Sequence, residues 1–569
     1  MRAPAHGLGR PWALALGLAL LVVGSTGHRF ANDFVFDDEH LIRDGGVIHD
    51  PSRLPEVWTH HTMYASAADP GRVQSVDTYR PLTLTLFFLD AQLSGHEPWA
   101  YHATNLLLHL GCVWLTFVVA IRLLGRSARW ASFYGAAVFA VHPWAVEAHV
   151  WINGRSDPLA LLLGLGGFWL LLGAEVHGAR AAARRVLAAA LVLLGLLSKE
   201  TLLTVLPAMA LAPSPAGTDL AWAARLRGRV PPLAGAALAY LGARSWVLSG
   251  LAMHRDAAML AEAAYRLPAL MVEGIRHALA PPLPYLRSLR DEYANLAPWQ
   301  VALFVAILTA AAALAFWGRR RWPVASWSAL WFFPPLVPVA IITTVLWPGF
   351  GRYLYLPLCG LAFALAAVAQ RVRARVERPR WLVAAGASHV AVLAVLAALF
   401  TRDFRHSDAL YGAAMRARPD AAMPHGWSGL SLRDAGEHRA AARELLRAAE
   451  LDPSTHRYLV HAGRALLQSG DRAGAARVAA RGIRRFHGRP EEASYRLLAV
   501  NAMSERDPSR AVAHLDRCLE VWPGRTECRR ALERLLHDAD DAEAHRRAAE
   551  RRMRRRPDRA EVLRALLER

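Results

Sequence analysis

Residues 142–157 read HPWAVEAHVWINGRSD, placing two histidines, two carboxylates and an arginine between two apolar runs. Ionisable residues beside apolar runs of membrane length are costly in lipid, so they mark either a functional cavity or a membrane surface. On both sides of this stretch, apolar runs long enough to cross a bilayer recur up to about residue 400, and none follows. The sequence therefore predicts an all-α chain, with a polytopic membrane domain over residues 1–400 and a second domain over residues 401–569.

Eleven membrane spans are predicted from the length and apolar character of these runs. They are 12–27, 102–121, 131–150, 157–174, 186–198, 201–212, 230–248, 298–317, 323–347, 352–370 and 381–400. A weaker segment, 262–283, is interrupted by Arg266, Glu273 and Arg276, which favours a re-entrant or interfacial helix. For the first run a signal peptide is the alternative, although no cleavage site of small residues follows it.

The basic residues are arranged as an orientation signal. The chain has 67 basic and 47 acidic residues, but its 54% hydrophobic composition argues against disorder and against a nucleic-acid partner. Arginines cluster between the spans at 122–129, 180–185, 225–229, 319–321 and 371–380. Because such clusters stay cytoplasmic, we expect the N-terminus inside the cell and the tail outside. If residues 186–212 formed a single helix, the tail would lie on the cytoplasmic side. That helix would also place Lys199 and Glu200 within the bilayer, where charge is costly.

The composition also bears on source and redox compartment. Lys199 is the only lysine and alanine is abundant, which indicates a high-GC bacterial source. We therefore expect an integral protein of the bacterial inner membrane, or of the endoplasmic reticulum membrane if the source is eukaryotic. Four cysteines are too few for a disulfide scaffold. Cys518 and Cys528 are either bonded or free thiols, and Cys112 and Cys359 are expected to pack within spans.

The tail carries a helical repeat of about 34 residues. Pro419 and Pro453 are separated by that period, and small residues recur between them at positions where two antiparallel helices must approach closely. The best unit carries Gly429, Ala441, Leu445 and Ala448, three units are clear, and a fourth is degenerate and basic. The pattern predicts tetratricopeptide repeats, an α-solenoid whose concave face binds peptides or proteins. A rigid spacer is the alternative.

The first outer loop, residues 28–100, opens directly after the first span with an acidic motif. Residues 32–39 read NDFVFDDE, which places Asp37, Asp38 and Glu39 at the membrane surface. A carboxylate pair can serve as a general base, because repulsion raises one pKa. It can equally bind a divalent cation. Taken alone, the motif also fits an ordinary solvated acidic loop.

Further polar groups are predicted on the same outer side. They are Arg80, Asn105, His109, His142, Glu147, Arg155, Asp157, Lys199, Glu200, Arg352 and Tyr353. Each has an ordinary structural explanation on its own, such as a helix cap, a local ion pair or an arginine that reaches the membrane surface. Together they describe an outward-opening cavity suited to a lipid-linked phosphate, which arginine and lysine would hold.

These motifs, in this order, resemble the transmembrane and tetratricopeptide-repeat O-mannosyltransferases that modify cadherins. The resemblance rests on the acidic pair, YRPL, HPxxxE followed by WIxGRxD, SKE, RYLYLP and the repeat tail. It implies the C-type glycosyltransferase fold and a sugar donor linked to polyprenyl phosphate, with mannose as the sugar in the animal members. The sugar would pass to a hydroxyl of an acceptor protein on the non-cytosolic side, and no cofactor beyond a possible divalent cation is expected.

The resemblance also picks out particular residues, and we infer the roles of those outside the acidic pair from their chemistry. Asp37 and Asp38 match the family's acidic pair as base and positioning group, with His142 and Glu147 as further catalytic candidates. Arg80, Arg155, Lys199, Arg352 and Tyr353 are the candidates for holding the donor phosphate. Glu39, Asn105, His109, Asp157 and Glu200 are supporting candidates. The segment Trp144-Ala145-Val146 departs from the animal pattern, which puts the sugar and the acceptor in question more than the fold.

Two rival functions remain open. The first is an O-antigen ligase or protein oligosaccharyltransferase, but those enzymes place their catalytic loop between late spans, whereas the largest polar loop here follows the first. The second is a non-catalytic membrane scaffold that displays the repeat domain, and it leaves the outward polar groups unexplained.

Overall fold

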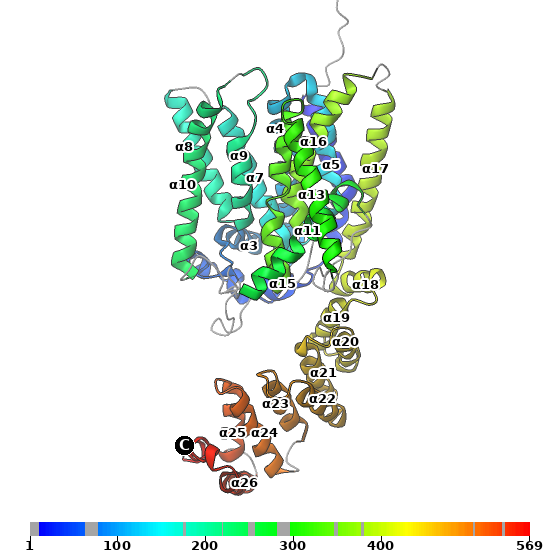
Figure 1. The fold of residues 1–569 in the computed structure, drawn as a ribbon. Coiled ribbons are helices and arrows are strands. Elements are labelled where there is room, and N and C mark those ends of the chain that lie inside the picture. The colour runs from blue at the N-terminus through cyan, green and yellow to red at the C-terminus, as the bar shows by residue number, and fades with distance from the viewer. Residues whose placement is uncertain are drawn as a thin grey trace, which may run out of the picture. The chain divides into compact units, whose positions relative to one another are not determined.

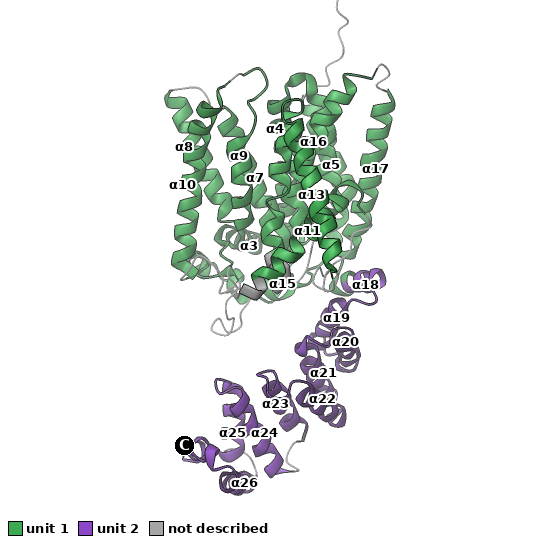
Figure 2. Ribbon diagram, in the orientation of Figure 1, with its two compact units in different colours: residues 1–410 green, residues 411–569 purple. Residues whose placement is uncertain are grey.

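The computed structural model describes residues 11–62, 78–173, 178–218, 220–248, 257–281, 296–345, 351–376, 380–503, 507–537 and 541–568. Within these ranges every regular element is a helix, so the predicted all-α fold is confirmed. The chain divides into two compact units, residues 1–410 and 411–569 (Figure 2).

Unit 1 is a bundle of long helices that run side by side (Figure 1). Its helices of nine or more residues are α1 (Pro11–Thr26), α3 (Pro81–Ser94), α4 (Trp99–Leu124), α5 (Arg129–Val141), α7 (Ser156–Gly173), α8 (Ala179–Leu196), α10 (Trp222–Leu248), α11 (Ala257–Leu279), α13 (Pro298–Gly318), α14 (Pro323–Phe332), α15 (Leu336–Val345), α16 (Tyr355–Arg373) and α17 (Arg380–Asp403). Short helical segments include α2 (Gly46–His49), α6 (Val146–His149) and α9 (Leu206–Leu211).

Six helical segments among the described residues are long and apolar enough to cross a membrane. They are Trp12–Ala31, Trp99–Leu124, Ile152–Gly173, Pro298–Gly318, Gly351–Arg373 and Arg380–Asp403. Each contains or overlaps a predicted span, and the chain is an integral membrane protein. The first helix, α1, buries Leu14, Leu18 and Val22 and packs against α5 and α17, as expected of a permanent part of the bundle. The segment predicted as re-entrant or interfacial forms α11, which packs along α13 and α15.

Two predicted spans are wrong as single helices, and proline explains both. Helix α5 ends at Val141, and His142 takes an extended conformation because the residue before Pro143 is disfavoured in the α region. Residues 142–155 then form short turns instead of completing a span over 131–150. The predicted span 323–347 is likewise divided into α14 and α15 at Pro334-Pro335.

The segment 186–212 is not one helix. Helix α8 ends at Leu196, Lys199 is extended, and a short helical turn over Glu200–Val205 leads into α9. The prediction of two short segments in place of one helix is therefore confirmed, and Lys199 and Glu200 lie at the break between them.

Each arginine cluster lies at the helix end remote from the polar motifs. Helix α4 carries Asn105 near its start and Arg122 near its end, and α16 begins beside Arg352 and ends at Arg371 and Arg373. Helix α8 begins near Arg180 and ends before Lys199. The polar motifs therefore gather at one end of the bundle and the arginine clusters at the other.

Unit 2 is a helical solenoid in which consecutive helices pack on one another. Its helices are α19 (Ala422–Asp434), α20 (His438–Leu451), α21 (His456–Gln468), α22 (Arg472–Arg485), α23 (Glu492–Met503), α24 (Pro508–Val521), α25 (Thr526–His537), α26 (Ala542–Arg555) and α27 (Ala560–Leu567), and the division from unit 1 falls within α18 (Ser407–Ala417). A Cβ added to Gly429 would lie 2.6 Å from Cγ of Leu445, so the small residue permits the close approach of α19 and α20. The tetratricopeptide assignment itself remains a prediction. Cys518 and Cys528 form a disulfide, and Cys112 and Cys359 are buried thiols.

Candidate active site

The acidic motif is held in a fixed, strained loop after α1. Phe36, directly before the aspartate pair, has φ of 58°, the only positive φ at a non-glycine among the described residues. Such a conformation costs about 1–3 kcal/mol, so the surrounding contacts must maintain it. The Trp151 indole donates to the Val35 carbonyl (3.2 Å), and the Phe36 amide donates to the Ser407 hydroxyl (3.2 Å). That hydroxyl donates in turn to Glu39 (2.9 Å), so Glu39 shares the contact that holds the Phe36 backbone.

The two aspartates occupy different environments. Asp38 is fully buried, and its Oδ1 accepts a hydrogen bond from the backbone N–H of Asn153 (2.8 Å). Asp37 is half-buried, and no described residue donates a hydrogen bond to its carboxylate. Burial raises the pKa of Asp37, and the nearby positive charge of Arg352 partly opposes this shift. Asp38 therefore ties the loop to residues 151–153, whereas the Asp37 carboxylate is not tied to it by a hydrogen bond from a described residue.

Arg352 is the cation best placed to receive an anionic group. Its guanidinium lies 4.7 Å from the Trp151 ring centroid and 5.1 Å from that of Tyr353, and it donates to the Tyr353 hydroxyl (3.4 Å). It is half-buried and forms no ion pair with any described residue within 4.0 Å. The Trp151 and Tyr353 rings stabilise the guanidinium without neutralising its charge. Arg352 and Tyr353 can therefore bind a phosphate group.

Two further cations already have carboxylate partners. Lys199 is buried and paired with Asp157, and its ammonium lies 5.4 Å from the Tyr353 ring centroid. Arg80 makes two parallel hydrogen bonds to Glu200, of 3.0 and 2.6 Å. The Tyr79-Arg80-Pro81-Leu82 motif also meets the break after α8 through its backbone, since the Leu82 amide donates to the Leu197 carbonyl (3.3 Å). The structure thus brings Arg80, Asp157, Lys199, Glu200 and Tyr353 to one place.

The contacts of Arg155 are those of a structural residue. Its side chain is fully buried, pairs with Asp90 (2.5 Å), and donates to Asn105 (2.9 Å) and to the Tyr101 carbonyl (3.0 Å). The side-chain NH₂ of Asn105 donates to the Trp151 backbone carbonyl (3.1 Å). Arg155 and Asn105 therefore lock the 151–155 turn onto α3 and α4. Sequence reasoning missed Asp90, although a lone carboxylate in the apolar run 81–93 was a signal for a buried pair.

Glu147 and His142 lie at the centre of the turns after α5. Oε2 of Glu147 accepts from the Gly351 amide (3.1 Å), which joins the 142–157 stretch to the Arg352 motif, while its Oε1 is buried without a hydrogen-bond partner. His142 uses both ring nitrogens on backbone groups, at Trp144 N (3.3 Å) and Ala278 O (3.3 Å). Glu147 keeps a free acceptor beside Arg352, whereas His142 caps the turn and anchors α11.

Behind the acidic loop lies a buried basic and aromatic network that sequence reasoning largely missed. Arg29 is fully buried and donates to the His149 carbonyl (2.7 Å), and its guanidinium also contacts Nδ1 of the same histidine (3.0 Å). The His149 ring stacks on that of His109 at 3.7 Å, and His109 hydrogen-bonds the Tyr355 hydroxyl (2.7 Å). His109 was predicted as a supporting residue, whereas Arg29 and His149 are far apart in sequence and carried no shared pattern.

The glycine of the WINGR stretch is required by close packing. A Cβ on Gly154 would lie 2.5 Å from the Glu147 carbonyl oxygen and 2.8 Å from that of Ala148. The turn can fold back on itself only without a side chain there. That fold places the Asn153 amide against Asp38 and Arg155 against Asp90, so one glycine supports both contacts.

The described residues contain no group of three or more histidine, cysteine, aspartate or glutamate side chains arranged to hold a metal ion. A divalent cation at the acidic pair stays a prediction. Taken together, the described residues form an all-helical membrane protein with a polar site, which includes arginine and lysine side chains, at one end of its bundle.

Comparisons with known proteins agree with the resemblance drawn from the motifs. The chain is 34% identical over 167 residues to the protein O-mannosyl-transferase TMTC4 of Homo sapiens, covering 26% of this chain and 22% of that protein. It is 34% identical over 147 residues to TMTC2 of Mus musculus, covering 25% and 16%. Against Tmtc1 of Drosophila melanogaster it is 33% identical over 124 residues, covering 22% and 14%. All three bear the name protein O-mannosyl-transferase, which confirms the predicted resemblance.

The matched segments span about a fifth or less of the length of these relatives. No family model matches the chain, and no solved structure matches it.

Proposed function

We propose that this protein is a membrane glycosyltransferase that moves a sugar from a polyprenyl-phosphate-linked donor to a hydroxyl of an acceptor protein. The sugar is mannose, by similarity to the named O-mannosyl-transferases. The observation that carries the proposal is the meeting of an accessible carboxylate, Asp37, with an unpaired cation, Arg352, beside the Lys199–Asp157 and Arg80–Glu200 pairs. A scaffold has no need for a strained loop that presents a carboxylate next to a cation.

The reaction we propose is a single displacement. Asp37 takes the proton from the acceptor hydroxyl, whose oxygen attacks the anomeric carbon of the sugar. The bond between that carbon and the phosphate oxygen breaks, and its electron pair leaves with the polyprenyl phosphate. Arg352 receives the phosphate, and Lys199 and Arg80 add positive charge while their carboxylate partners hold them in place. Preorganised charge of this kind lowers the barrier because the protein need not reorganise as the leaving group becomes more negative.

The supporting residues keep these groups in position. Asp38 holds the acidic loop through the Asn153 amide, and Arg155 and Asn105 hold the turn that contains Asn153. Glu147 holds the start of the Arg352 motif through Gly351. We assign positioning roles to Asp38, Arg155 and His142, and phosphate-binding roles to Arg352, Tyr353, Lys199 and Arg80.

We further propose that the site faces away from the cytosol, with the arginine-rich helix ends on the cytosolic side. Two features support this orientation. Arginine clusters occupy the opposite helix ends, as they do at cytoplasmic faces. The Cys518–Cys528 disulfide in the tail is of a kind that persists in oxidising compartments such as the periplasm or the endoplasmic reticulum lumen. Unit 2 would then bind the acceptor protein on the same side as the site.

The test is transfer of labelled mannose from polyprenyl-phosphate mannose to protein in membranes that contain the wild-type chain or Asp37→Asn. Transfer that depends on the wild-type chain supports the proposal. Equal labelling in membranes with and without the protein, over a panel of polyprenyl-linked sugars, would favour the scaffold. Transfer of a whole lipid-linked oligosaccharide, with no transfer of a single sugar, would favour a ligase or oligosaccharyltransferase.

A further inference from the structure

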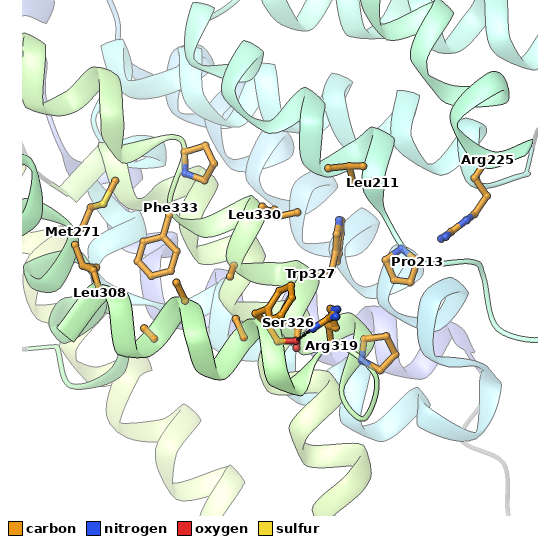
Figure 3. Close-up of a pocket in the computed structure, with 17 residues that line it drawn as sticks. Leu211, Pro213, Arg225, Met271, Leu308, Arg319, Ser326, Trp327, Leu330 and Phe333 are labelled. Carbon is orange, nitrogen blue, oxygen red and sulfur yellow. Dashed lines mark hydrogen bonds between the residues drawn. The ribbon is translucent and has the colours of Figure 1, made fainter. Parts of the chain in front are cut away.

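The bundle has an apolar groove away from the candidate active site. It has a volume of about 760 Å³ and lies between the end of α9, the start of α10 and helices α11, α13 and α14 (Figure 3). The alanines of α13 on its wall, at 311, 312 and 315, leave room for a chain to lie against the helix. Leu211, on the groove wall, ends the segment that begins at Glu200 in the candidate active site. The part of the groove lined by Leu211 therefore lies toward the arginine-rich end of the bundle.

The charge in this groove is confined to one end. Arg225 and Arg319 line it, and none of the lining residues is acidic. Figure 3 shows the two arginines on one side of the view and Met271, Leu308 and Phe333 on the other. Neither arginine forms an ion pair with a described residue, and Nε of Arg225 is buried without a hydrogen-bond partner. An anionic group at this end would meet two uncompensated guanidinium groups.

The length of the apolar part indicates the kind of lipid that fits. From Leu308 to Arg319, α13 rises about 17 Å at roughly 1.5 Å per residue. That is about the thickness of one leaflet's hydrocarbon layer, since a whole bilayer core is about 30 Å. An acyl chain of a phospholipid fits this length, whereas a polyprenyl chain extends well beyond it.

We infer that the groove binds one anionic glycerophospholipid, with its phosphate between Arg225 and Arg319 and an acyl chain along α13. Basic pockets between membrane helices on the arginine-rich side have this chemistry. The lipid lies in the leaflet opposite the candidate active site, so it is a resident lipid and not the sugar donor. It lies in the groove that α13 forms with α11 and α14, and no described α13 side chain is fully buried by the protein itself. The inference does not depend on the proposed glycosyl transfer.

The test measures binding of phosphatidylglycerol and phosphatidylcholine, with identical acyl chains, to the delipidated full-length protein by native mass spectrometry. One phosphatidylglycerol should remain bound, and Arg225→Gln with Arg319→Gln should weaken it by about fivefold or more for each arginine. Arg227→Gln with Arg320→Gln is the matched control, because it removes two charges from the same clusters at residues outside the groove. This control should bind as the wild type does.

A second pair of variants tests the apolar part without changing charge. Ala312→Phe fills the groove and should abolish binding, whereas Ala310→Phe, two residues earlier on the opposite side of α13 and outside the lining, should not. The unfolding temperature of each variant shows whether it is folded. Equal losses in the groove and control variants would overturn the inference, as would equal retention of the two phospholipids. Displacement of phosphatidylglycerol by polyprenyl phosphate at equal concentration would also overturn it.

Discussion

At the scale of single residues, the two adjacent aspartates lie in different environments, and we propose that Asp37 is the reactive group and Asp38 a structural one. Asp37 is half-buried and accepts no hydrogen bond from described residues, whereas Asp38 is fully buried and accepts from Asn153. We expect Asp37→Asn to lower the rate of sugar transfer by about 10²–10⁴-fold, the usual contribution of a general base, with little change in unfolding temperature.

Asp38→Asn should lower both the transfer rate and the stability. The asparagine side chain has one acceptor oxygen, whereas the Asp38 carboxylate has two, which accept from the backbone N–H groups of Asn153 and Val35. One of these buried donors therefore loses its partner, at a cost of about 1–3 kcal/mol. Asp44→Asn is a suitable control, because Asp44 is exposed and pairs with Arg43 at the surface. Thermal unfolding of the three variants beside their transfer rates distinguishes the roles. A transfer rate near the wild-type value in Asp37→Asn would refute its assignment as base.

The pH dependence of transfer follows from the same carboxylate. Burial raises the pKa of Asp37, so its deprotonated fraction, and with it the maximal rate, should fall as the pH drops through that raised pKa. The positive charge of Arg352 lowers the same pKa, so Arg352→Gln should move the acidic limb of the rate profile to higher pH. The profile is measured at saturating donor, because Arg352 is also expected to bind the phosphate. An unchanged limb in this variant would place the base elsewhere.

At the scale of elements, the site depends on the close packing of α5 and α16. A Cβ on Gly135 would overlap the Ala362 carbonyl oxygen, so the two helices touch through this glycine. The segments that follow α5 and precede α16 carry Glu147 and Gly351, which are hydrogen-bonded to each other. Gly135→Ala should therefore separate these segments, lower the stability by about 1–3 kcal/mol and reduce transfer.

Gly235→Ala is the matched control for that prediction. Gly235 lies within α10, and a Cβ there meets nothing within 4 Å. Alanine at such a helical position should leave transfer unchanged and raise stability by up to about 1 kcal/mol. Thermal unfolding and transfer assays on both variants provide the measurement. Equal behaviour of the two alanines would show that the contact between α5 and α16 does not support the site.

The elements themselves were largely predictable from hydropathy and charge. The break at Lys199 followed from the cost of burying charge in lipid, and the structure places it between α8 and the turn that starts at Glu200. The early end of α5 was a missed proline signal at Pro143. The pairing of Arg155 with Asp90 was beyond sequence reasoning, because it joins α3 to the 151–155 turn and depends on how the helices pack. The same holds for Arg29 and His149, which lie 120 positions apart.

At the scale of the whole molecule, the alternation of polar and arginine-rich helix ends gives the chain a direction in the membrane. Helices α4, α8 and α16 each have polar motifs at or beside one end and arginines at the other, so a compartment assigned to one of these ends assigns the opposite end as well. We expect a reporter fused after residue 569 to be active on the non-cytosolic side. Activity of a cytosolic reporter there would reverse the proposed face of the candidate active site.

The cysteines give an independent test of the same orientation. The chain has four, of which Cys518 and Cys528 are bonded in unit 2 and Cys112 and Cys359 are buried thiols in unit 1. A disulfide persists only where the compartment is oxidising, because cytosolic reductants keep thiols reduced. After denaturation without reductant, a polyethylene-glycol maleimide should therefore modify two cysteines, and prior reduction should raise this to four. Four additions without reductant would mean that the tail carries free thiols, and it would favour a cytosolic tail. Cys518→Ser with Cys528→Ser should show two additions in both conditions, which assigns the difference to this pair.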